Sequence, residues 1–109
     1  MRLTLTVLAL TLIPLAVQAD EIAPEACEIT AGIVAEAQAL RVDGDTERRA
    51  TRKLNRAHAE LGASYTEQVI PLLTNYVYMQ PEAALDQDLA AFWKQTCLTT
   101  DLSSVLPGD

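Results

Sequence analysis

The chain has 109 residues, with 8 Lys and Arg against 15 Asp and Glu, which gives a formal net charge of −7. This length fits one domain and excludes both a Rossmann enzyme with a separate substrate domain and a TIM barrel. The acidic balance and the aromatic content of only 5% argue against nucleic-acid binding, which needs a cationic surface and stacking side chains.

Residues 1–19 have the pattern of a secretory signal peptide. Arg2 gives a positive start, an apolar run extends from Leu3 to Ile13, and small residues precede a cleavage site after Ala19. The apolar run is too short to cross about 30 Å of hydrocarbon, so an uncleaved anchor is the weaker interpretation and we expect no stable membrane insertion. The pattern predicts a periplasmic or secreted protein, with a helical domain over residues 20–98 and a flexible tail over 99–109.

Apolar residues at steps of three and four predict a first helix over about residues 24–42. Gly32 lies inside this helix, where we expect it to allow the close approach of another helix. Gly44 is expected to end the helix within the turn Asp43-Gly44-Asp45. The predicted buried stripe consists of Ala26, Ile29, Ile33, Ala37 and Leu40.

Two further helices are predicted in the middle of the chain. The second covers about residues 46–61, with Asp45 or Thr46 as its N-cap and Gly62 as its stop. Its narrow buried stripe consists of Ala50, Leu54, Ala57 and Leu61. The third begins at a capping-box sequence, Ser64-Tyr65-Thr66-Glu67, and runs to about residue 79. We expect Pro71 to kink this helix or to delay its start.

A fourth helix is predicted to begin with Pro81, a residue that the first helical turn accepts. Its expected buried stripe consists of Leu85, Leu89, Phe92 and Thr96, with Trp93 and Cys97 beside it. Most large side chains lie in the stretches 76–79 and 92–93, and we expect them to form the core. Because adjacent helical residues point about 100° apart, one of Phe92 and Trp93 is expected to face outward.

Cys27 and Cys97 are the two cysteines of the chain. An even count in an exported protein favours a disulfide, and neither a Cys-x-x-Cys motif nor a second His for a metal site competes with that interpretation. The fold class that follows is all-α: a small four-helix bundle in which one disulfide joins the first helix to the last.

The densest charge feature is a cluster of five cations within nine residues of the second helix. It consists of Arg48, Arg49, Arg52, Lys53 and Arg56. Like charges four residues apart on a helix repel, so the cluster needs acidic neighbours or an acidic partner. One interpretation is a solvated or internally paired face, with Glu25, Glu28 and Glu36 of the first helix or Asp86 and Asp88 of the fourth as candidates. The other is a binding face for an anionic patch on a partner protein or for a lipid headgroup.

The sequence offers no catalytic, cofactor or metal motif. Gly-x-Ser-x-Gly, His-Glu-x-x-His and phosphate-binding loops are missing from it, and Asp86 and Asp88 diverge because they are two residues apart on a helix. His58 stands alone and is expected to be a surface or partly packed side chain. We therefore expect a protein that is not an enzyme, and no pattern specifies its oligomeric state.

The spacing of several residues resembles a group of small exported two-cysteine helical proteins from bacteria that have no assigned function. The frame is Cys27, Leu40-Arg41-x-x-Gly44, Tyr78-x-x-Pro81 and Phe92-x-x-x-x-Cys97, which covers about residues 27–98. By architecture the chain also resembles periplasmic acid-stress chaperones and exported immunity proteins.

These likenesses suggest two functional hypotheses. The first is an exported, non-catalytic binding protein that acts as a chaperone or stress-response factor, with acid loosening the bundle as its carboxylates lose charge. The second is an immunity protein or inhibitor that binds a partner protein through the basic helix face.

Overall fold

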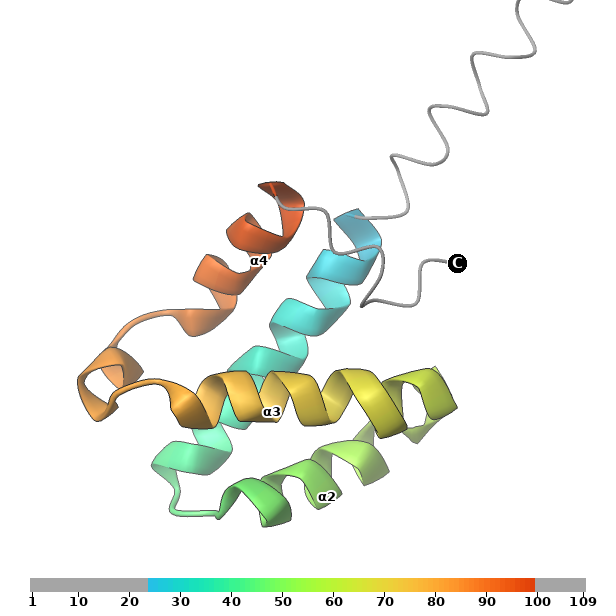
Figure 1. Ribbon diagram of the computed structural model, residues 1–109, viewed down its shortest axis with the longest axis horizontal. Helices are drawn as coiled ribbons and strands as arrows, with labels where there is room; N and C mark the ends of the chain where they lie inside the picture. Colours follow the sequence, from blue (N-terminus) through green and yellow to red (C-terminus); the bar gives the residue numbers. More distant parts are fainter. Residues whose placement is uncertain (1–23, 100–109) are drawn as a thin grey trace, which may run out of the picture.

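The computed structural model describes residues 24–99, so the predicted signal peptide and the tail beyond Thr99 lie outside the described residues. Within that range the protein is all-α, and four helices follow one another along the chain (Figure 1). The first helix is described over residues 24–42, as predicted, and α2 covers Glu47–Ala57, α3 covers Ile70–Met79 and α4 covers Leu89–Thr99. Short helical segments of other types cover Ala59–Leu61, Tyr65–Val69 and Glu82–Asp86.

The other helices form two groups about the first helix, α2 with α3 in one and α4 in the other (Figure 1). The α2 and α3 helices lie side by side; α3 crosses the lower half of the first helix, α2 begins beyond its lower end, and α4 lies along its upper half. A single apolar core connects them. Its fully buried large side chains are Ile33, Val34, Val69, Ile70, Leu73 and Val77.

The turn between the first helix and α2 follows the sequence signals closely. Gly44 has a φ of 99°, its N–H donates to the Arg41 carbonyl, and the N–H of Asp45 donates to the Leu40 carbonyl. This pair of bonds is the Schellman motif, which needs a left-handed residue at the Gly44 position. Thr46 then caps α2, because its Oγ1 accepts from the Arg49 N–H at 3.2 Å.

The predicted second helix is too long at its C-terminal end. The α-helix ends at Ala57, and after His58 the chain continues as one 3₁₀ turn before Gly62, whose φ is 97°. Of the expected stripe, Ala50 and Leu54 are buried, but Ala57 is exposed and Leu61 is only partly buried.

The capping box predicted at Ser64 is wrong, and the delayed helix start expected of Pro71 is replaced by a change of helix type. Ser64 already has helical φ and ψ and makes no capping bond, and residues Tyr65–Val69 form a π-helical segment. Proline lacks an N–H and cannot continue a regular ladder from the preceding turn. Helical turns start at Ala63, change to the π-helical segment, and return to a regular α-helix at Ile70, with Pro71 in the first turn of α3.

The predicted start of the fourth helix at Pro81 is also wrong. Residues Glu82–Asp86 form a 3₁₀ helix, and α4 begins only at Leu89, where the Asp88 carboxylate accepts from the Ala91 N–H at 3.0 Å. The break changes which side of α4 faces the core. Leu89 and Cys97 are buried and Trp93 packs against them, whereas Phe92 is 63% exposed and leaves the expected stripe.

Gly32 does not serve the helix contact that the sequence suggested. It lies on the exposed side of the first helix, and a Cβ built there would meet nothing within 4 Å.

The first helix contacts its neighbours through polar as well as apolar side chains. Gln38 donates to the Leu85 and Gln87 carbonyls, and Arg41 donates to the Val77 and Gln80 carbonyls, so both side chains satisfy carbonyl groups at helix ends.

Candidate binding face on helix α2

The five cations of the predicted cluster all lie exposed on α2, but they fall into two groups. Arg49 and Lys53 both pair with Asp45, at 3.7 Å and 2.8 Å respectively. Arg48, Arg52 and Arg56 form no ion pair with any residue between 24 and 99. We call these three residues, spaced four apart, the arginine ridge.

The helix that carries the arginine ridge is held firmly on its opposite side. Ala50 and Leu54 are buried in the core, and the Thr51 hydroxyl lies 2.8 Å from the Thr74 hydroxyl of α3. Asn75 of α3 donates to the Glu47 carboxylate at 3.2 Å. The ridge therefore projects from a fixed helix and not from a loop.

Asp45 pairs with one group of cations and not with the other, because it lies at the N-terminal end of α2, where Arg49 and Lys53 reach it. Its carbonyl oxygen accepts from the Tyr78 hydroxyl at 2.7 Å, which ties the turn to α3. The pKa of the Asp45 carboxyl is lowered, first by the hydrogen bond from Lys53; burial opposes this effect in part, and the charges of Lys53 and Arg49 lower the pKa further.

Three of the five acidic residues named as candidates to neutralise the cluster have other partners. Glu28 pairs with Lys94 of α4 at 2.7 Å, and Glu36 pairs with His58 at 2.8 Å. Asp88 caps α4. None of these three acids pairs with the cluster; two of its cations pair instead with Asp45, which lies four residues before Arg49 and eight before Lys53.

His58 is a partly buried side chain with a structural contact, as the sequence predicted. Its Nε2 atom lies 2.8 Å from Glu36 Oε1, which joins the end of α2 to the first helix. Among residues 24–99, no group of three His, Cys, Asp or Glu side chains is placed to hold a metal ion.

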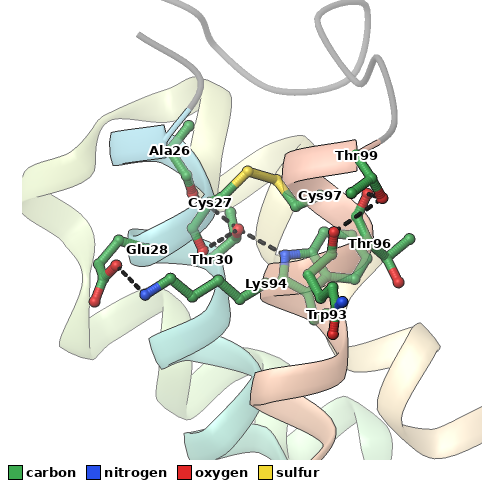
Figure 2. The surroundings of a disulfide bond; sticks show 10 residues. Ala26, Cys27, Glu28, Thr30, Trp93, Lys94, Thr96, Cys97 and Thr99 are labelled. Atoms are coloured by element: carbon green, nitrogen blue, oxygen red, sulfur yellow. Dashed lines mark hydrogen bonds and ion pairs between the residues drawn. A yellow bond between two sulfur atoms is a disulfide. The ribbon is translucent and has the colours of Figure 1, made fainter. Parts of the chain in front are cut away.

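The disulfide predicted between Cys27 and Cys97 is present and joins the first helix to α4 (Figure 2). The two Cα atoms are 5.7 Å apart, within the usual range for such a bond, and both residues are buried. Beside the disulfide, Trp93 Nε1 donates to the Thr30 hydroxyl at 2.7 Å, and Thr30 in turn donates to the Ala26 carbonyl (Figure 2). The disulfide and the hydrogen bond thus join the same two helices at one place. Among residues 24–99 no cysteine has a free thiol.

The aromatic residues are used mainly for packing. Trp93 lies against Tyr76, with 5.3 Å between ring centroids, and burial is the first cause that raises the pKa of the Tyr65, Tyr76 and Tyr78 phenols. Phe92 is the outward-facing member of the Phe92–Trp93 pair. The exposed large apolar residues are Val42, Leu72, Met79, Phe92 and Leu98, none of which belongs to α2.

Comparisons of the chain with protein-family models, with curated proteins and with solved structures found no match. Over the described range, none of the helices has the length and apolar character needed to cross a membrane.

Proposed function

We propose that this chain is an exported, non-catalytic binding protein that holds an acidic partner protein on the arginine ridge. One observation carries the proposal: in a chain with a net charge of −7, three exposed arginines share one side of one helix and form no ion pair with any residue between 24 and 99. The mutual repulsion of these cations is relieved when carboxylates of another molecule lie against them. The buried disulfide supports the exported location, since such bonds persist in oxidising compartments.

An affinity difference between two matched double variants tests this function. Arg52→Gln/Arg56→Gln removes two ridge charges, and Arg49→Gln/Lys53→Gln removes two charges that are already paired with Asp45. A partner is first isolated from an exported-protein fraction and purified, and its dissociation constant is then measured by calorimetry at low and high salt.

We expect the ridge variant to bind about ten-fold more weakly at low salt and the control to bind within about three-fold of the wild type. Far-UV circular dichroism establishes that both variants keep their helices. Equal affinities of the two variants would show that the ridge is not the binding face.

A chaperone activity at low pH is the second candidate, and the placement of the ion pairs favours it. The pair Glu28–Lys94 joins the first helix to α4, Glu36–His58 joins it to the end of α2, and Asp45–Lys53 joins the turn before α2 to that helix. Ion pairs of carboxylates stabilise folded proteins at neutral pH and are lost in strong acid. The test is light scattering of an acid-sensitive client enzyme at pH 3 with and without the protein. Suppressed aggregation at pH 3 but not at pH 7 is the expected result, and a client that aggregates equally in both samples contradicts it.

A further inference from the structure

We infer that the arginine ridge recognises an acidic helix, through paired guanidinium–carboxylate hydrogen bonds and not through positive charge alone. This inference rests on the proposed function, since it specifies the chemistry of the partner that the ridge holds.

The first observation is the kind of cation left on the surface. The chain has two lysines, and both are used in short internal ion pairs: Lys53 with Asp45 at 2.8 Å and Lys94 with Glu28 at 2.7 Å. Within residues 24–99, three Lys or Arg side chains make neither an ion pair nor a side-chain hydrogen bond. All three are arginines, and they form the ridge.

Arginine differs from lysine in the geometry that it offers. The guanidinium group is a planar fork whose N–H groups donate two parallel hydrogen bonds to one carboxylate, whereas the ammonium group of lysine is a compact and strongly hydrated charge. A surface that required only positive potential would be served equally well by either residue. Three arginines in one row therefore favour recognition of planar oxyanions.

The spacing of the ridge indicates the shape of the partner. Residues four apart on a helix are separated by about 6 Å along its axis, so Arg48, Arg52 and Arg56 extend over about 12 Å. Carboxylates at positions i, i+4 and i+8 of a second helix repeat at the same interval. Rows of residues four apart are also the ridges by which two helices most commonly pack against each other.

The composition of α2 separates a protein partner from a membrane. Helices that bind the lipid interface carry large apolar side chains beside their cations. The exposed side of α2 has no such residue, because its buried face holds Leu54 and the exposed large apolar residues belong to other elements. The acidic remainder of the chain is also repelled by an anionic bilayer.

Three probes test the inference by NMR titration of the disulfide-bonded protein at about 20 mM salt, where exposed charges are weakly screened. The first is an alanine-based peptide with Glu at positions i, i+4 and i+8. The second has the same composition with Glu at i, i+2 and i+5, which scatters the carboxylates around the helix. The third is a vesicle of phosphatidylglycerol.

The protein is compared with two triple variants of Arg48, Arg52 and Arg56, one with all three residues changed to Lys and one with all three changed to Gln. Lysine keeps the charge and is a good helix former, so the first variant isolates the fork geometry. We expect the wild type to bind the regularly spaced peptide about five-fold more tightly than its isomer, with amide shifts confined to α2. The Lys variant should lose about five-fold in affinity, and the Gln variant should lose binding altogether.

The outcomes separate this inference from the proposed function. A Lys variant that binds like the wild type, equal binding of the two peptides, no binding of either peptide, or tighter binding to the vesicles would each overturn recognition of an acidic helix by arginine forks. A Gln variant that binds the regularly spaced peptide as tightly as the wild type would overturn the proposed binding face itself.

Discussion

Helices α3 and α4 both pack against the first helix, but they are held there by different interactions. Four residues of α3 are buried, namely Ile70, Leu73, Thr74 and Val77. On α4 only Leu89 and Cys97 are buried, and its other ties are the disulfide, the Trp93–Thr30 hydrogen bond and the Glu28–Lys94 pair.

The difference shows how a chain with few large apolar residues can still fix four helices. Where the α3 sequence supplies Ile, Leu and Val at the right intervals, burial of apolar surface is sufficient. On α4, where Phe92 and Leu98 are exposed, a covalent bond adds to the few apolar contacts that the helix makes.

The largest effect is expected from removal of the disulfide. Changing Cys27 and Cys97 to serine opens a loop with a sequence separation of 70 residues, and chain entropy predicts a loss of about 4 kcal/mol in the free energy of unfolding. Because α4 buries few apolar side chains, its amides should exchange with solvent before those of α3. Urea unfolding and hydrogen exchange measure the two effects, and equal protection of α3 and α4 in the variant would contradict the comparison.

A smaller loss is expected from truncation of the α3 core. Leu73 is fully buried, so Leu73→Ala removes apolar burial and leaves a cavity, and the free energy of unfolding should fall by about 3 kcal/mol. Leu72 is 42% exposed and is the matched control, for which Leu72→Ala should change the stability by less than about 1 kcal/mol. Similar urea midpoints for the two variants would show that packing does not hold α3 in place.

The smallest effect concerns the turn that joins the first helix to α2. The pKa of Asp45 is lowered in the folded state, chiefly by its hydrogen bond with Lys53, so the carboxylate stabilises the fold above its unfolded pKa of about 4. This contribution disappears as the pH falls through the lower folded-state pKa. Asp45→Asn should therefore lower the urea midpoint slightly at pH 7 and not at pH 2.

Asp43→Asn provides the control for that measurement, since Asp43 is exposed in the same turn and makes no ion pair with the described residues. Its urea midpoint at pH 7 should match the wild type. A difference between Asp45→Asn and the wild type that persists unchanged at pH 2 would show that the Asp45 charge is not its source.

The number of helices, the Gly44 turn, the Thr46 cap and the disulfide could all be predicted from the sequence, because each depends on residues close together or on a single pair of cysteines. The helix types could not. Apolar residues three and four apart are compatible with α, 3₁₀ and π turns, and the choice over Tyr65–Val69 and Glu82–Asp86 depends on Pro71 and on the carbonyl contacts made by Gln38.

For the candidate site, the cation cluster and its helical spacing were visible in the sequence, but its division into paired and unpaired members was not predicted. The separation of Asp45 from Arg49 by four residues was the available signal. Asp88 before the apolar run 89–93 was likewise a readable N-cap that would have placed the start of α4 correctly. Thr30 and Trp93 gave no such signal, because their contact joins residues 63 positions apart.

The position of the two sulfur atoms along the chain also sets the order of events during synthesis. Cys27 has no correct partner until almost all of the helical domain has been synthesised, because Cys97 follows it by 70 residues. An oxidase that meets Cys27 early can form only a mixed disulfide, which waits for the last helix to arrive. Formation of the disulfide is therefore expected to follow synthesis of α4, as the last step in the assembly of the fold.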